Sequence, residues 1–338
     1  MPVSVGIVAN PASGRDIRRL VSGASVFDNA EKGSMVYRLM IGLGAAGVDE
    51  VLFMPAAAGV GESLRRHIKG NTGSRKQSLP DLEHLDMRLT GDARDTAEAV
   101  RRMRERGVCA IIILGGDGTC RVASSHSYDT PICTLSTGTN NAFPQFREAT
   151  VAGLATGFVA TGALDEGVVR REKALRVRVD GEEALALVDV AVCRERWIGA
   201  RALYEPGAVS NIFVASASPD AVGLSSVAGL LEPVSRDEPH GLRVELTTPE
   251  SAETTLSVPL APGLVSAVGV AAYDRLKPGK AIELEFAYGS LALDGEREIE
   301  LRPEHKAEVW LSQDGPLTVD VEECMRRAAK AGLLNGRG

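Results

Sequence analysis

Asp117 is the residue whose setting in the sequence points most directly to chemistry. It lies in the run Gly115-Gly116-Asp117-Gly118-Thr119, directly after four large apolar residues, Ile111-Ile112-Ile113-Leu114. Such an apolar run indicates a strand buried on both faces, as in a parallel sheet. Glycines at its end let the backbone pass close to a bound group, and open α/β sheets bind ligands at this edge. The run therefore predicts a ligand site around Asp117, with a tight turn that binds nothing as the alternative for this run taken alone.

Two further strand-to-loop junctions carry groups that suit phosphate. The predicted strand 3–8 leads into Asn10-Pro11-Ala12-Ser13-Gly14-Arg15, where Asn10 and Ser13 bring hydrogen-bonding side chains and Arg15 a positive charge. The predicted strand 130–135 leads into Thr137-Gly138-Thr139-Asn140-Asn141. If one βαβ series contains all three strands, their loops lie along one edge of a parallel sheet. The sequence therefore predicts one phosphate site built from three loops.

A dinucleotide fingerprint and a Walker A loop are both excluded. Gly42-Leu43-Gly44-Ala45-Ala46-Gly47 has the spacing GxGxxG, but a predicted helix (33–47) precedes it and a predicted strand (51–54) follows it. The fingerprint requires a strand before the glycines and a helix after them. The chain also contains no GxxxxGK[ST] sequence. We therefore interpret these glycines as the end of a helix rich in small residues.

The elements that must position the three loops follow an α/β pattern. A short strand at 86–90, a helix at 92–106 with an acidic start and a basic end, a strand at 108–114 and a helix at 149–161 are predicted. From about residue 168 the pattern changes to short alternating runs, beginning with a hairpin of strands 175–179 and 184–192. The predicted fold class is α/β, with a parallel-sheet, Rossmann-like N-terminal domain followed by an antiparallel β-sandwich domain.

Length and composition limit the remaining possibilities. The 338 residues suffice for two domains, and we place the boundaries at 1–163 and 164–312, with a C-terminal segment 313–338 packing back on the first domain. A net charge of -7 argues against a nucleic-acid partner. Five cysteines without CxxC spacing are expected to be reduced thiols, and no apolar run is long enough to span a bilayer. We expect a cytoplasmic protein without stable membrane association.

The three loop motifs together resemble a known superfamily. Asn10–Gly14, Gly115–Thr119 and Thr137–Asn141 occur in this order ahead of a β half, and this arrangement resembles the NAD kinases, diacylglycerol kinases and sphingosine kinases. The stretches Ser136–Pro144, Ala261–Val265 and Leu291–Glu298 are similar to its ATP-NAD kinase-like branch, the acetoin-catabolism protein X family. The resemblance covers nearly the whole chain.

The resemblance implies an ATP- and Mg²⁺-dependent kinase, with the first domain binding the nucleotide and the second serving substrate binding and oligomerisation. It implies that Asp117 accepts the proton of the substrate hydroxyl or organises Mg²⁺, which suits phosphoryl transfer. The lipid kinases carry a second acidic turn that maps here to Asp294-Gly295-Glu296, so Asp294 is a second catalytic candidate, with an ordinary hairpin turn as the alternative. The residues implied to bind the nucleotide are Asn10, Ser13, Gly14, Arg15, Gly115, Gly116, Gly118, Thr119, Thr137, Gly138, Thr139, Asn140 and Asn141.

The acceptor is less well defined, because this chain departs from both standard patterns. The Asn-Glu pair of NAD kinases is replaced by Val188 and Asp189, and the aspartate of the lipid kinases by Ala142. Asp189, Ser218 and Glu296 are the candidate acceptor-binding residues. Three functions follow: a kinase for the 2′-hydroxyl of NAD or a related nucleotide, a kinase for a lipid or small metabolite, and a nucleotide-binding regulator without turnover. The resemblance also implies a homo-oligomer, either dimer or tetramer, and leaves ATP or polyphosphate open as the donor.

Overall fold

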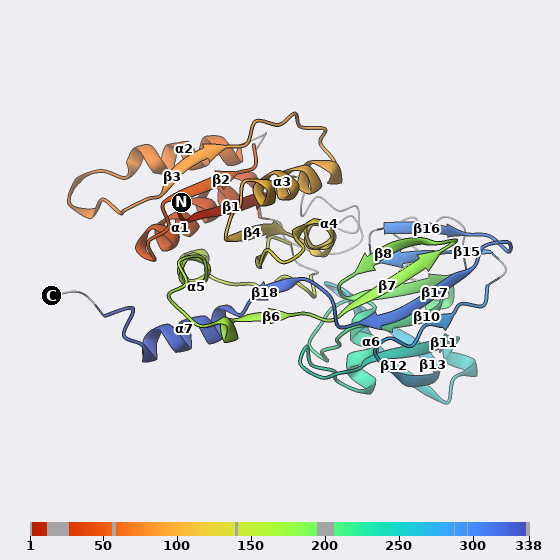
Figure 1. Cartoon of the computed structure of the whole chain (residues 1–338). Coiled ribbons are helices and arrows are strands. Elements are labelled where there is room, and N and C mark those ends of the chain that lie inside the picture. Colours follow the sequence, from red (N-terminus) through yellow and green to blue (C-terminus); the bar gives the residue numbers. More distant parts are fainter. Residues whose placement is uncertain are drawn as a thin grey trace.

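The structure is a computed structural model that describes residues 2–11, 27–55, 59–138, 141–194, 206–286, 288–295 and 297–335. Figure 1 shows two parts: one in which helices surround a sheet, and one built mainly of strands. The chain passes from the first part to the second between β6 and β7, and returns between β17 and β18.

A mostly parallel sheet forms the first part. Its strand order is β3-β2-β1-β4-β5-β18-β6, in which β6 runs antiparallel to β18. Strands β1 and β4 are buried along their whole length, which explains their unbroken apolar sequence. The strands are β1 Ser4–Ala9, β2 Glu50–Phe53, β3 Asp81–His84, β4 Ala110–Gly115, β5 Ile132–Ser136, β6 Val169–Arg171 and β18 Leu317–Val319.

Helices cover both faces of this sheet. One hydrophobic cluster joins alternate residues of the central strands, such as Ile112 and Leu114, to α1, α5 and α7. A second cluster joins the intervening residues, such as Ile111 and Ile113, to α3 and α4, so the two faces follow the period of two of a strand. The helices are α1 Asn29–Ala45, α2 Val60–Gly70, α3 Ala93–Glu105, α4 Asp117–Ser127, α5 Ala149–Ala160 and α7 Val321–Lys330.

The first glycine of the GxGxxG sequence, Gly42, serves helix packing. A Cβ on Gly42 would lie 2.3 Å from the carbonyl oxygen of Thr150 at the start of α5. A Cβ on Gly153 of α5 would lie 2.4 Å from the carbonyl oxygen of Leu39. Helices α1 and α5 therefore approach so closely that only glycine fits at these contacts, in agreement with the interpretation as a small-residue helix.

Two antiparallel sheets form the second part. The larger has the order β12-β13-β11-β10-β9-β15-β16 and the smaller β14-β17-β7-β8. They share one hydrophobic core, to which Leu175 and Val309 contribute from the smaller sheet and Val190 and Leu291 from the larger, so the predicted β-sandwich is confirmed. Its elements are β7 Ala174–Val179, β8 Glu182–Ala186, β9 Asp189–Cys193, β10 Val209–Val214, α6 Ser225–Leu231, β11 Gly241–Thr247, β12 Thr254–Ala261, β13 Leu264–Leu276, β14 Ile282–Glu283, β15 Gly289–Leu293, β16 Arg297–Leu301 and β17 Ala307–Ser312.

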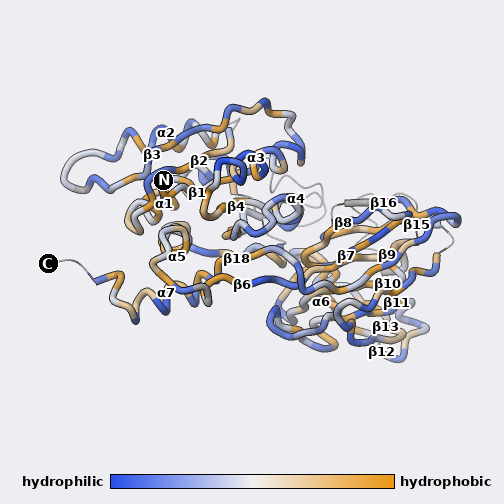
Figure 2. The backbone as a smooth tube through the Cα atoms, viewed as in Figure 1, coloured by the Kyte–Doolittle hydropathy of each residue, from blue (hydrophilic) through white to orange (hydrophobic). Residues whose placement is uncertain are grey.

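Figure 2 shows hydrophobic residues concentrated along the sheets of both parts, whereas α3 is largely hydrophilic. Helix α7 packs on α5, where the Cys324 thiol donates to the carbonyl oxygen of Ala155 at 3.6 Å. Within the described ranges, no helix combines the length and the apolar character needed to cross a membrane.

Two predicted strands are wrong in detail. The strand expected at 86–90 lies instead at 81–84, where Leu82 pairs with Val51 of β2. Its own sequence is polar, so pairing at the sheet edge outweighs local propensity. The run 184–192, expected to be one strand, is divided between β8 of the smaller sheet and β9 of the larger.

The division at 187–188 has a clear cause in the structure. The carboxylate of Asp294 accepts hydrogen bonds of 2.8–3.3 Å from the backbone N–H groups of Leu187, Val188 and Asp189. These bonds satisfy the backbone where the chain leaves one sheet for the other. The apolar sequence shows no such break, because the group that stabilises it lies more than a hundred residues further along the chain.

Candidate active site

The three predicted loops begin at one edge of the parallel sheet. Strands β1, β4 and β5 are neighbours, with Ala9 opposite Leu114 and Gly115 opposite Ser136. The ladder continues past the strand ends, since Asn10 N–H donates to the carbonyl of Leu114 and Thr137 N–H to that of Gly115, both at 3.2 Å. The expectation that the strand ends meet is therefore confirmed for the described residues.

The first two motifs are joined by side chains. Asn10 Nδ2 donates to Thr119 Oγ1 at 3.0 Å, which links the end of β1 to the first turn of α4. Of the remaining first-loop candidates, Ser13, Gly14 and Arg15 lie outside the described residues.

Lys32 is a component of this region that the sequence did not indicate. It lies in the first turn of α1, is 1% exposed and donates from Nζ to the carbonyl oxygen of Asn10 at 2.9 Å. A positive charge is thus held at the end of β1, where it favours an anion bound nearby. Its signal in the sequence is weak, because a single lysine in a helix is usually solvated.

Asp117 joins the second and third motifs. It is the first residue of α4 and is buried, with 9% exposure. Its carboxylate accepts hydrogen bonds of 2.8–3.2 Å from the backbone N–H groups of Ala142 and Phe143. The acid therefore lies at the N-terminus of a helix, where the dipole stabilises negative charge, and holds the third loop in place.

Asn141 packs between the glycines of these two loops. Its Nδ2 donates to Ser136 Oγ at 2.8 Å. A Cβ on Gly116 would lie 2.9 Å from Asn141 Oδ1, and one on Gly138 would lie 3.1 Å from Asn141 Nδ2. A side chain at either glycine would therefore displace the Asn141 amide. Thr139 and Asn140 lie outside the described residues.

Asp294 is placed differently from what a role in contact with substrate requires. Its side chain has no exposed surface, and Oδ2 lies 3.3 Å from Nε of Arg121 on α4. Burial raises its pKa to about 6, while Arg121 and the amides of residues 187–189 act in the opposite direction. The structure therefore assigns this carboxylate to the contact between α4 and the β-sandwich, and its catalytic role stays a prediction that this placement does not support.

The acceptor candidates are dispersed. Asp189 begins β9, is 7% exposed and accepts from Asp294 N–H through its carbonyl oxygen at 3.0 Å. Ser218, which follows β10 in the chain, donates to the carboxylate of Asp220. Glu296 lies outside the described residues. The structure brings Asp189 near Asp294. Among the described residues, the side chain of Ser218 has its hydrogen bond to Asp220 and none to the three loops.

The residues present fit a nucleotide phosphate and its metal ion. Gly116, the N-cap of α4, supplies no side-chain cap to the first-turn N–H groups, and such groups bind anions. Among the described residues no cluster of three His, Cys, Asp or Glu side chains forms a metal site. Mg²⁺ in kinases is commonly held by one or two carboxylates together with substrate phosphates, so Asp117 is the residue that would hold it.

Family models match both parts of the chain. Residues 5–163 match the family model of the ATP-NAD kinase N-terminal domain, and residues 173–314 match that of the acetoin catabolism protein X C-terminal domain. The fold is therefore of the kinase type. Two solved structures from Bacillus anthracis str. Sterne, a diacylglycerol kinase and a putative diacylglycerol kinase, are similar at TM-scores of 0.46 and 0.49. Each is 12% identical and covers 94% of this chain and 96% of its own.

A relative described as acetoin catabolism protein X, from Cupriavidus necator, is 42% identical over 336 residues, which are 98% of this chain and 93% of the relative. The chain belongs to the acetoin catabolism protein X family.

Proposed function

We propose that this protein is an ATP- and Mg²⁺-dependent kinase that transfers a phosphoryl group to a hydroxyl, with the 2′-hydroxyl of NAD as the acceptor. The observation that carries the proposal is the position of Asp117 at the N-terminus of α4, between the glycines that end β4 and the third loop. This is the position in which a carboxylate can reach both a phosphate bound at the helix and a hydroxyl beside it.

The residues divide the chemistry between them. The first-turn N–H groups of α4, Asn10 and the buried Lys32 attract the phosphates of the nucleotide. Mg²⁺, when bound, would neutralise the negative charge on the phosphate oxygens. As the acceptor oxygen forms its bond to the γ-phosphorus and the bond to the leaving ADP breaks, Asp117 takes the hydroxyl proton. The products are ADP and the phosphorylated acceptor, which is NADP when NAD is used.

A second candidate is a nucleotide-binding regulator without turnover. The observation that favours it is that both oxygens of Asp117 accept hydrogen bonds from the backbone and that the residue is 9% exposed. A carboxylate in this setting serves well to fix the third loop, and need not take part in proton transfer.

Asp117→Asn distinguishes the two. The amide keeps Oδ1, which accepts from both Ala142 and Phe143, and loses only the Oδ2 acceptor of Ala142, so the variant is expected to fold and to bind nucleotide in the absence of Mg²⁺. As a kinase, the protein forms NADP from NAD and ATP, and the variant loses about 10²–10⁴-fold in kcat. NADP is measured enzymatically, and transfer to other hydroxyl acceptors with ATP labelled in its γ-phosphate.

The matched control is Asp129→Asn, the same change at a carboxylate that is 88% exposed and paired with Arg171. This variant is expected to keep full activity. NADP formation by the wild type no higher than by Asp117→Asn would refute NAD as the acceptor. Tight nucleotide binding by calorimetry without any phosphoryl transfer would establish the regulator.

A further inference from the structure

Arg236 contacts the same stretch of backbone that Asp117 holds, from the other side. Its Nη2 donates to the carbonyl oxygens of Phe143 at 2.6 Å and Ala142 at 3.3 Å. The peptide group between Ala142 and Phe143 thus has its carbonyl bonded to a guanidinium and its N–H bonded to the Asp117 carboxylate at 2.8 Å. A peptide dipole placed between a cation and an anion strengthens both hydrogen bonds.

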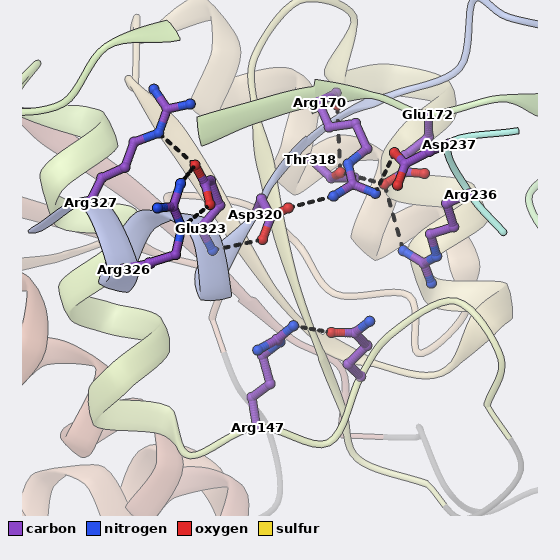
Figure 3. A network of polar contacts seen from close by, with 11 residues as sticks. Arg147, Arg170, Glu172, Arg236, Asp237, Thr318, Asp320, Glu323, Arg326 and Arg327 are labelled. Carbon is purple, nitrogen blue, oxygen red and sulfur yellow. Dashed lines mark hydrogen bonds and ion pairs between the residues drawn. The ribbon is translucent and has the colours of Figure 1, made fainter. Parts of the chain in front are cut away.

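Arg236 is itself held firmly. Its guanidinium lies over the ring of Phe143, 4.8 Å from the centroid, and Nη1 lies 3.6 Å from Glu172, whose side chain is 4% exposed. Glu172 accepts from Thr318 Oγ1 at 2.6 Å. Figure 3 shows Arg236 pointing toward Glu172, beside Thr318 and Arg170. These contacts fix the planar group in one orientation.

The residues that hold Arg236 come from the connections between the two parts of the molecule. Glu172 lies between β6 and β7, and Thr318 lies in β18, on the returning segment. Next to Glu172, Lys173 is buried and donates to the carbonyl oxygens of Glu238 and His240, which fixes the loop that carries Arg236. Arg236 therefore connects the β-sandwich and both crossing segments to the third loop of the candidate active site.

We propose that Arg236 is a positioning residue, which holds the Ala142–Phe143 peptide so that Asp117 and the third loop keep a fixed geometry. In this role it acts through the peptide and needs no contact with phosphate or acceptor. The expected effect of Arg236 on catalysis rests on the proposed function. The effect of Arg236 on the Ala142–Phe143 peptide is independent of any reaction.

The test uses Arg236→Met, Arg236→Lys and a matched control, Arg243→Met. Arg243 also lies over a phenylalanine ring, that of Phe213, with a side chain 30% exposed against 24% for Arg236, and its bonds stay within the β-sandwich. Amide exchange is followed by mass spectrometry over residues 136–148, together with kcat and KM.

For Arg236→Met we expect amide exchange over residues 136–148 to be about tenfold faster. Methionine cannot donate to the carbonyl oxygens of Ala142 and Phe143, so this segment opens more often. The kcat falls about 10–100-fold while KM for ATP stays within about threefold, as expected when alignment is lost and binding is kept. Arg236→Lys shows a smaller change of the same kind, since an ammonium retains one carbonyl contact. Arg243→Met leaves exchange over 136–148 and kcat unchanged.

Exchange over 136–148 that is unchanged in both Arg236 variants overturns the inference, whatever the activity. Faster exchange spread equally over the whole chain in Arg236→Lys also overturns it, because that result is general destabilisation. If Arg236→Met does not fold, amide exchange over residues 136–148 in Arg236→Lys alone supports or overturns the inference. If the wild type transfers no phosphoryl group, the proposed function fails, and the exchange measurement still supports or overturns the positioning role.

Discussion

A side chain at position 116 would push against Asn141. The backbone of Gly116 has φ of -101°, which any residue adopts, so only the 2.9 Å approach of a Cβ to Asn141 Oδ1 opposes a side chain there. We expect Gly116→Ala to lower the free energy of unfolding by about 1–3 kcal/mol, as overpacking does, and to weaken nucleotide binding because Asn141 must move. Urea unfolding and calorimetry measure the two effects.

Gly70→Ala is the matched control. Gly70 ends α2 and has no atom within 4 Å of an added Cβ, so alanine is expected to be neutral or to stabilise by up to about 1 kcal/mol. Equal losses at the two positions would show that crowding by Asn141 does not explain the glycine.

At the residue scale, the sequence predicted the parts of the site that carry a motif. Asn10, Asp117 and Asn141 lie at adjacent strand ends as expected. Lys32, Arg121 and Arg236 were missed, because each is a single charged residue whose partner lies on another element. Charged residues are so frequent on protein surfaces that one of them, without a motif, does not stand out as buried.

Helix α4 connects the site to the β-sandwich through its own sequence. Asp117 begins the helix, and Arg121, one turn later, contacts Asp294. Asp294→Asn keeps Oδ1, which accepts from the amides of residues 187–189, but removes the charge that faces Arg121. Because burial outweighs the attraction of Arg121 and favours the neutral carboxyl group, we expect the neutral amide to keep or raise the free energy of unfolding at pH 7.5, by up to about 3 kcal/mol.

The pH dependence of the stability difference between wild type and Asp294→Asn is a separate prediction. Burial raises the pKa of Asp294 from 3.8 to about 6, so the folded protein binds a proton near pH 6 and the unfolded chain only near pH 3.8. The carboxyl group therefore contributes stability that grows as the pH falls between these values. Relative to Asp294→Asn, the wild type should therefore gain unfolding free energy from pH 7 to pH 4.5 in guanidinium titrations. A wild type that loses stability relative to the variant over this range would contradict the raised pKa.

At the element scale, prediction succeeded where local patterns and tertiary pairing agree. The strand ending at Gly115 was predicted because its apolar run is buried in the structure. The helix at 93–105 was predicted because its acidic start and basic end coincide with the ends of the helix. The prediction missed the strand at 81–84, which forms by pairing with β2. It also missed the break at 187–188, which the hydrogen bonds to Asp294 stabilise. Both depend on partners that are distant in sequence, which no local pattern contains.

At the scale of the whole molecule, one hydrophobic cluster joins the two parts. Cys120 and Ala123 of α4 belong to it together with Leu185, Leu187 and Val188 of the β-sandwich. Because this core is shared, we expect the two parts to unfold in one cooperative transition. Helix ellipticity reports mainly the first part and Trp310 of β17 reports the second, so their urea transitions should coincide in the wild type.

Leu187→Ala tests whether the shared cluster causes the cooperativity. Leu187 is 2% exposed, and its truncation should cost about 2–5 kcal/mol and separate the two transitions, because the helices then lose part of their contact with the β-sandwich. Leu242→Ala is the matched control, since Leu242 is buried in a cluster confined to the β-sandwich; it should lower both midpoints and keep them coincident. The idea is contradicted if the wild type already shows two separate transitions, or if Leu242→Ala separates them as much as Leu187→Ala does. Either result would show that the two parts fold independently of this cluster, and that Arg236 and Asp294 connect domains that are each stable alone.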